Sequence, residues 1–259
     1  PFMVTGYNAK NFAKNAYKIM VDIDQNELDK KNLEIDLKIH GDAKKFISEL
    51  YVDLLKIKTF QFEKRWLEYC KFIRKKYPIV LPEYRLQKKY VNSYFFIDTL
   101  SNILKKGDCV VTDMGLSFVG THQAFTTKKN QKIFTNSGHA PMGWGLPAAV
   151  GAYFASNRKK IICLTGEGGF QMNLQELATV LHHKIPVKIF IYNNGGYLTI
   201  KQTQQLGFGN RIMGSDYKSG LSFPNYKDIA RAHKIKYIKI SNNKFLESKI
   251  EKTVKYKGP

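Results

Sequence analysis

The stretch Ile161-Ile162-Cys163-Leu164-Thr165-Gly166-Glu167-Gly168-Gly169 decides the fold, because an apolar run ends in it abruptly at an acid set between glycines. A second apolar run, over residues 187–192, ends in the same way at Asn193-Asn194. Both runs have the length and composition of buried strands. Because parallel strands place their carboxyl ends at one edge of a sheet, the pattern predicts that Glu167 and Asn194 lie close together. Asp113, at the end of an expected strand over 108–113, could share the same crevice.

Alternating strand and helix patterns surround these two runs from about residue 90 to the end of the chain. Such alternation is typical of an α/β fold, and we expect a doubly wound parallel sheet with helices on both faces. Asn173 followed by Glu176 resembles a capping box, which would begin a helix at residue 173. The expected strands are 108–113, 132–135, 161–165, 187–192 and 236–240, and the expected helices are 91–104, 116–125, 143–155, 173–183, 226–233 and 245–254.

The first residues of the chain indicate the tail of another α/β domain. Residues 18–23 have the pattern of a buried strand, and residues 43–55 place apolar side chains at helical spacing. Residues 58–76 are helical in pattern, and Pro78 and Pro82 mark a linker. We therefore expect a domain tail over 1–57, a helix and linker over 58–89, and a second domain over 90–259. A chain that begins and ends in proline is expected to be part of a longer protein.

The composition excludes some classes of protein. Its net charge of +21 raises the question of a nucleic-acid-binding module, but the lysines are scattered and arginine does not cluster with aromatic residues. No apolar run reaches the roughly 18 residues of a membrane span, and we expect no signal peptide. Cys70, Cys109 and Cys163 are far apart in apolar surroundings, which favours buried thiols and a cytoplasmic protein.

The two strand ends supply the chemistry of a metal–diphosphate site. Glu167 could give a carboxylate oxygen to Mg²⁺, Asn194 its amide oxygen and Gly196 its carbonyl, with diphosphate oxygens completing the shell. Gly168 and Gly169 would leave room for a phosphate beside the backbone. Two unrelated turns would be the simpler reading of either half alone. A dinucleotide fingerprint fits worse, because the third glycine and the later strand-end acid are missing.

These residues resemble the signature of thiamine diphosphate enzymes, specifically those of the acetolactate-synthase-like family. The resemblance rests on the Gly-acid-Gly and Asn-Asn pair, on Gly138-His139-Ala140-Pro141-Met142-Gly143 with the residues up to 151, and on residues 168–180. Residues 18–24 resemble the end of that family's central domain. The similarity is strongest over 112–205, and it implies a thiamine-diphosphate-binding fold preceded by the last part of the central domain. Residues 90–259 would be the diphosphate-binding domain without its last strand.

The resemblance implies a set of site residues and partners. Mg²⁺ would be held by Glu167, Asn194 and the Gly196 carbonyl, and Met142 would prop thiamine diphosphate into its bent form. The intact protein would be a lyase or transferase that decarboxylates a 2-keto acid and joins the product to an acceptor, and it would be a homodimer or homotetramer. FAD is left undecided. Cofactor contacts would come from Gly115, Leu116, Ser117, Phe118, Ala140, Met142, Gly166, Gly168, Gly169, Asn194 and Gly196.

The chain departs from the family in two ways. Glu167 stands where the family has Asp, and the glutamate that activates the cofactor lies in a pyrimidine domain that this chain lacks. We therefore expect the isolated chain to be inactive, with His139 the one candidate for a catalytic role. A non-catalytic relative and a basic nucleic-acid-binding module stay open as alternatives. Gln202 and Gln205 could line a substrate entrance, and the composition of 208–222 favours a mobile lid.

Overall fold

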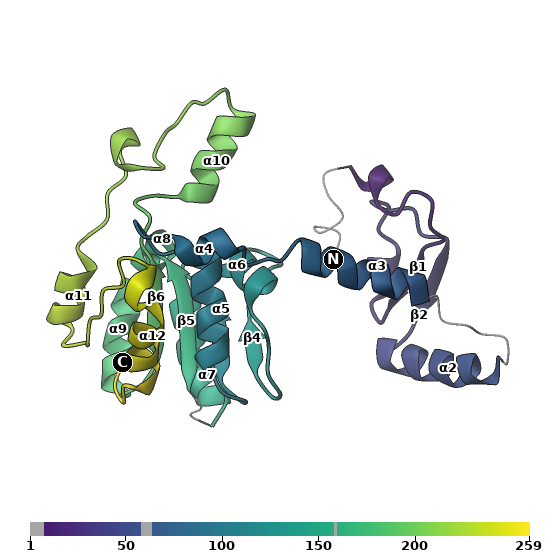
Figure 1. The fold of residues 1–259 in the computed structure, drawn as a ribbon, viewed down its shortest axis with the longest axis horizontal. Coiled ribbons are helices and arrows are strands. Elements are labelled where there is room, and N and C mark those ends of the chain that lie inside the picture. The colour runs from purple at the N-terminus through teal and green to yellow at the C-terminus, as the bar shows by residue number, and fades with distance from the viewer. Residues whose placement is uncertain (1–7, 58–63, 158–159) are drawn as a thin grey trace. The chain divides into compact units, whose positions relative to one another are not determined.

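The computed structural model describes residues 8–57, 64–157 and 160–259, and the chain forms two compact units, Pro1–Arg74 and Lys75–Pro259 (Figure 1). The first unit contains a short 3-10 helix (Ala9–Asn11) and the parallel strands β1 (Ile19–Asp22) and β2 (Leu37–His40). Helix α1 (Gln25–Leu28) connects the strands, and α2 (Ala43–Lys56) follows them. The Asp42 carboxylate accepts from the Lys45 N–H and so begins α2.

The expected strand and helix of the first unit are therefore present, although β1 is half-buried to exposed and not buried. Helix α3 (Lys64–Lys76) covers part of the helix expected over 58–76, and residues 58–63 lie outside the described residues. The divisions expected at 57 and 89 stay predictions about the domains of the intact protein. Within the described ranges, no helix is both long and apolar enough to cross a membrane.

The second unit is built on a four-stranded parallel sheet in the order β4-β3-β5-β6. Its strands are β3 (Cys109–Thr112), β4 (Lys132–Phe134), β5 (Ile161–Gly166) and β6 (Lys188–Tyr192). Its helices are α4 (Pro82–Leu86), α5 (Ser93–Ile103), α6 (Leu116–Ala124), α7 (Gly145–Ala155), α8 (Glu167–Met172), α9 (Leu177–His182), α10 (Leu198–Gly207), α11 (Tyr226–Ala232) and α12 (Leu246–Lys255), with short 3-10 turns at Leu174–Glu176, Tyr217–Ser219 and Asn243–Phe245.

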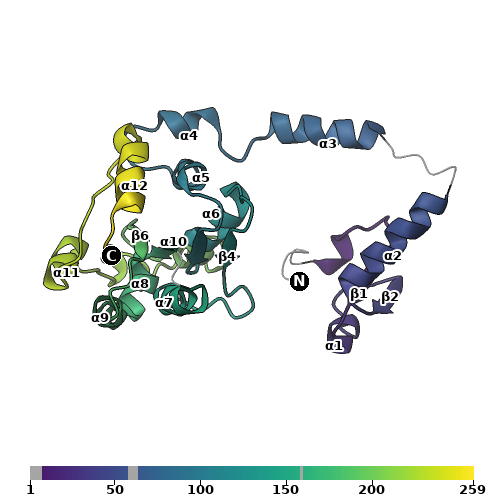
Figure 2. The same cartoon turned by 90° about the horizontal axis from the view of Figure 1, so that it is seen from below.

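Helices cover both faces of this sheet, which confirms the doubly wound α/β fold (Figure 2). On one face, α7, α8 and α9 pack on side chains such as Val111 and Cys163. On the other face, α5 and α12 pack on Val110 and Leu164. Alternate strand residues point to opposite faces, so strands buried on both sides read as continuous apolar runs. Cys109 and Cys163 are buried as expected, whereas Cys70 is exposed.

Two expectations about local structure are wrong. Residues 236–240 form no strand in the described structure, because alternating apolar side chains do not by themselves supply a hydrogen-bonded neighbour. The capping box at Asn173 does not form either. Helix α8 begins at Glu167, immediately after β5, and the Asn173 side chain donates instead to the Gly143 carbonyl at 2.7 Å. The helix expected over 173–183 is consequently a 3-10 turn followed by α9.

Candidate functional site

The predicted strand ends meet at the carboxyl edge of the sheet. Strands β5 and β6 are neighbours, and Gly166 pairs with Tyr192. Glu167 follows directly and is 1% exposed. Its Oε1 atom accepts from the backbone N–H groups of Asn194, Gly195 and Gly196 at 3.0, 2.6 and 2.9 Å. The carboxylate therefore closes the turn 194–196, which we call the clamp turn.

A second buried carboxylate, that of Asp113, lies at the end of β3 on the same edge. It accepts from the N–H of Met114 at 2.8 Å, from the N–H of Gly143 at 3.1 Å and from the Thr165 hydroxyl at 2.9 Å. Burial raises the pKa of Asp113, and the hydrogen bond from the Met114 N–H opposes this effect. Asp113 thus ties together three segments that carry predicted cofactor contacts, those near residues 115, 143 and 166.

The glycines beside Glu167 are in close contact with other segments. A methyl group on Gly168 would lie 2.0 Å from the Tyr197 ring and 3.0 Å from Met142 Cε. A methyl group on Gly169 would lie 2.3 Å from Asp113 Oδ2. Contacts this short leave no room for a side chain at either position unless the Tyr197 ring or the Asp113 carboxylate moves. The backbone of 168–169 is therefore packed closely against Tyr197, Met142 and Asp113.

The remaining predicted residues lie around this edge. Gly115 has φ +75° and precedes α6, and the buried Ser117 hydroxyl donates to the Met114 carbonyl at 2.9 Å. Ala140 has a left-handed φ of +52° in an exposed turn. The side chains of His139 and Asn194 are exposed, and Leu116, Phe118 and Met142 are half-buried. No motif in the sequence points to Tyr197 or to Tyr226, whose hydroxyl donates to the Glu167 carbonyl at 3.1 Å.

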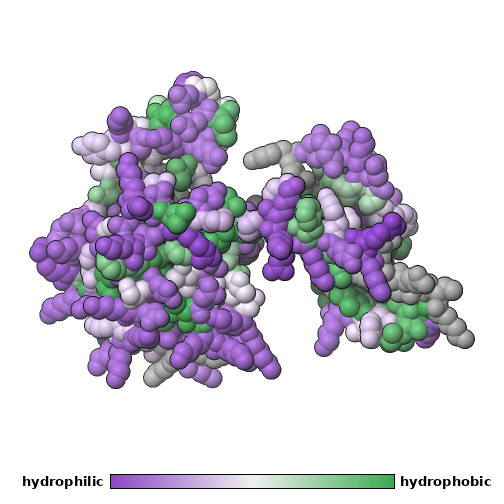
Figure 3. All heavy atoms as spheres, in the orientation of Figure 1, coloured by the Kyte–Doolittle hydropathy of each residue, from purple (hydrophilic) through white to green (hydrophobic). Residues whose placement is uncertain are grey.

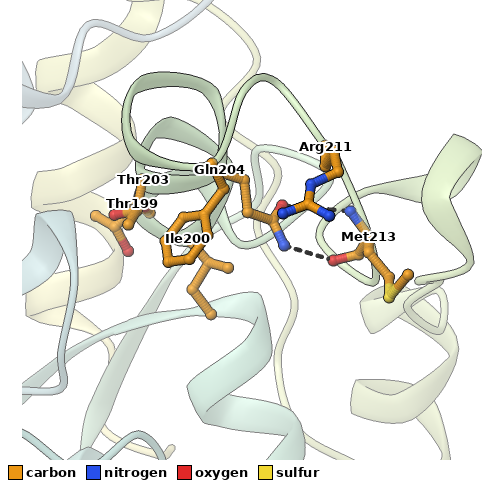
Figure 4. A pocket seen from close by; sticks show the side chains of 7 residues that line it. Thr199, Ile200, Thr203, Gln204, Arg211 and Met213 are labelled. Atoms are coloured by element: carbon orange, nitrogen blue, oxygen red, sulfur yellow. Dashed lines mark hydrogen bonds between the residues drawn. The ribbon is translucent and has the colours of Figure 1, made fainter.

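An open groove of about 550 Å³ lies between α10 and the segment after it (Figure 4). Gln204, rather than Gln202 or Gln205, lines it, and the Gln204 amide donates to the Met213 carbonyl at 2.8 Å. Apolar side chains are exposed on α10 and on the segment that follows it (Figure 3). The residues around the groove are Thr199, Ile200, Thr203, Gln204, Phe208, Arg211 and Met213.

Comparison with known families agrees with this geometry. Residues 113–259, which hold β5, β6 and both buried carboxylates, match the family model of the thiamine pyrophosphate enzyme, C-terminal TPP binding domain. This chain belongs to the thiamine pyrophosphate enzymes. The second unit is accordingly related to domains that bind thiamine diphosphate.

The relatives of this thiamine pyrophosphate enzyme include acetolactate synthase large subunits. That of Cyanidium caldarium is 35% identical over 260 residues, which cover 99% of this chain and 43% of the relative. Those of Porphyra purpurea and Lactococcus lactis are 34% and 31% identical, over 99% and 92% of this chain and 42% and 40% of the relatives. The chain thus spans about two fifths of the length of the curated relatives that it matches.

The donors at the clamp turn suit a divalent cation in a thiamine pyrophosphate enzyme. Among the described residues, no donor reaches Oε2 of Glu167, although Oε1 accepts three hydrogen bonds. The described residues contain no group of three or more His, Cys, Asp or Glu side chains that could hold a metal ion. A cation bound here could therefore meet one carboxylate, that of Glu167, and neutral amide and carbonyl oxygens, which is a donor set suited to Mg²⁺ that also binds phosphate oxygens.

Proposed function

We propose that the intact protein is an Mg²⁺- and thiamine-diphosphate-dependent lyase or transferase that acts on a 2-keto acid, by decarboxylation followed by carboligation, as in acetolactate synthase. The observation that carries this proposal is the convergence of Glu167 with the turn at Asn194–Gly196 at the carboxyl edge of the parallel sheet. The similarity to acetolactate synthase large subunits over nearly the whole chain supports the reaction class.

The chain's own residues would hold and orient the cofactor. Glu167 Oε2, the Asn194 amide oxygen and the Gly196 carbonyl would bind Mg²⁺, and the backbone of Gly168 and Gly169 would meet the diphosphate. Gly115, Leu116, Ser117 and Phe118 would lie along the same diphosphate.

Met142 and the Ala140 carbonyl would fix the aminopyrimidine ring. When bound, thiamine diphosphate supplies the carbon nucleophile that attacks a 2-keto acid. His139 is exposed next to Ala140 in the sequence, and a catalytic role for it near the cofactor stays a prediction. The proposal does not depend on a cytoplasmic location, on assembly into dimers or tetramers, or on the use of FAD.

Calorimetry on the intact protein tests the proposal most directly. Titration with thiamine diphosphate in the presence of Mg²⁺ should give saturable heat, and titration with thiamine, which lacks the diphosphate, should give almost none. Pyruvate and other 2-keto acids should then release CO₂ and yield a carboligated product of the predicted mass. Saturable heat without turnover of any 2-keto acid would favour the non-catalytic relative. The absence of heat, together with steeply salt-dependent DNA binding, would defeat the proposal in favour of a nucleic-acid-binding module.

A further inference from the structure

The segment after α10 is tied to the clamp turn by backbone contacts. Gly196 forms an antiparallel bridge with Asp216, and the Tyr197 N–H donates to the Ser215 carbonyl at 2.8 Å. A methyl group on Gly196 would lie 2.3 Å from the Ser215 carbonyl oxygen. The two backbones therefore touch directly behind Gly196, whose own N–H donates to Glu167.

Asp216 holds this segment in place through its side chain. Its Oδ2 atom pairs with Lys201 Nζ on α10 at 2.6 Å. Its Oδ1 atom accepts from the N–H and the hydroxyl of Ser219 at 3.0 and 2.8 Å, and the Ser219 hydroxyl also lies 2.9 Å from the Asp216 N–H. The Lys201 ammonium holds the pKa of Asp216 at about 2, well below its usual range. Asp216 is thus charged at neutral pH and bound on both oxygens.

Further contacts fasten the same segment to α10. Ser215 is fully buried, and its hydroxyl donates to Gln204 Oε1 at 3.0 Å. The composition of 208–222 favours a mobile lid, but these contacts fasten residues 213–219 to the helix that follows the clamp turn. Residues 213–219 are referred to below as the brace.

We propose that Asp216, together with Lys201, is a positioning residue for the clamp turn, an inference that rests on the proposed function. The brace contacts the backbone at Gly196, and Glu167 accepts from the Gly196 N–H. Together these contacts keep the Gly196 carbonyl where Mg²⁺ would need it. Asp216 acts through the backbone and does not itself touch the cofactor. Loss of its charge should leave the fold intact and loosen the turn.

The test compares Asp216→Asn with Asp228→Asn in the intact protein. Asp228 pairs with Arg231 on α11 at 3.0 Å, and both side chains are largely exposed, so the control removes the same charge from an ion pair outside the site. Asp216→Asn should raise the Kd of thiamine diphosphate at fixed Mg²⁺ by roughly 10- to 100-fold, as loss of outer-sphere partners does at other metal sites. The control should leave this Kd unchanged.

Lys201 gives a second route to the same answer. Lys201→Met should weaken cofactor binding about as much as Asp216→Asn, the double variant should weaken it no further, and Lys201→Arg should restore most of the affinity. The melting temperature of the second unit should change by less than about 3 °C in each variant. Wild-type affinity in Asp216→Asn or Lys201→Met, or an effect in the double variant equal to the product of the two, would overturn the inference.

Hydrogen exchange separates this inference from the proposed function. In the intact protein without cofactor, the amides of residues 194–201 should exchange at least about tenfold faster in Asp216→Asn than in the wild type or in Asp228→Asn. Unchanged exchange would refute the role of Asp216 even if the cofactor binds. If the wild type gives no heat with Mg²⁺ and thiamine diphosphate, the proposed function fails, and the exchange rates still decide whether the brace holds the turn.

Discussion

Replacing Gly169 with alanine tests how firmly the buried Asp113 carboxylate is fixed. Gly169 lies inside α8 and has no positive φ, so alanine changes only the space around it. The new methyl group would lie 2.3 Å from Asp113 Oδ2 and 2.8 Å from Cγ, where real contacts are about 3.4 Å or longer. The carboxylate must therefore move by about 1 Å, or α8 must shift on the sheet.

The hydrogen bonds of Asp113 set the size of the effect. Moving the carboxylate breaks or stretches a charge-assisted bond from Met114, Gly143 or Thr165, which costs about 1.5 to 3 kcal/mol. Overpacking a filled site costs about 1 to 3 kcal/mol more, and the better helix propensity of alanine returns up to about 1 kcal/mol. We expect the free energy of unfolding of the second unit to fall by about 2 to 5 kcal/mol.

The assay is urea unfolding followed by the fluorescence of Trp144, in a chain that also carries Trp66→Phe. The chain has two tryptophans, and Trp144 packs against the core of the second unit, so the signal reports on that unit. Gly151→Ala is the matched control, because Gly151 lies in α7 with nothing within 4 Å of the added methyl group. The control should raise stability by about 0.5 to 1 kcal/mol. If Gly169→Ala were neutral or stabilising, the reasoning about a fixed Asp113 would be refuted.

Three further outcomes follow from buried or shared polar groups. Burial, and secondarily Lys160, lowers the pKa of Lys188 from 10.5 to about 8, so the folded chain binds fewer protons than the unfolded chain between these values. Stability measured against Lys188→Met should therefore rise from pH 8 to 10.5, by at most about 3 kcal/mol, and a flat difference would contradict this. Lys128→Met should cost about 1 to 3 kcal/mol in urea unfolding, because Lys128 Nζ donates to three carbonyls at the end of α5, whereas the exposed Lys129→Met should change stability by less than about 0.5 kcal/mol. Glu167→Gln keeps an oxygen for the clamp turn and loses the charge. Calorimetry should therefore show roughly tenfold or greater weakening of Mg²⁺–cofactor binding in the intact protein, while the free energy of unfolding changes by less than about 1.5 kcal/mol. If Glu167→Gln lost as much stability as Glu167→Ala, the idea that the oxygen holds the turn and the charge binds the cation would be refuted.

The meeting of Glu167 with the clamp turn could be predicted because it depends on neighbouring parallel strands. Each strand is recognisable from its apolar run, and strand polarity alone brings the two ends to one edge. The same argument places Asp113, which follows β3, at this edge, but its role could not be predicted in the same way. It depends on Gly143 and Thr165, which lie 30 and 52 residues away in the sequence, and on how α7 and α8 pack.

Competition between local and distant partners explains the error at Asn173. Its local pattern with Glu176 fits a capping box, but the Gly143 carbonyl, 30 residues earlier, takes the Asn173 amide. Glu176 in turn accepts from the Thr179 hydroxyl at 2.9 Å. The contacts of the brace could not be predicted for a related reason. A segment rich in glycine and polar residues suggests mobility until its partners on α10 are known.

The glutamate at the clamp turn gives the site a further property. Glu167 satisfies three N–H groups with one oxygen, so the turn is closed by the protein itself and needs no cation to hold it. The same arrangement leaves one carboxylate oxygen and neutral donors for a dication, which is a weak set of ligands by itself. Diphosphate oxygens would have to supply the missing negative charge. Mg²⁺ and thiamine diphosphate should therefore bind with strong positive coupling, each raising the affinity for the other by the same factor.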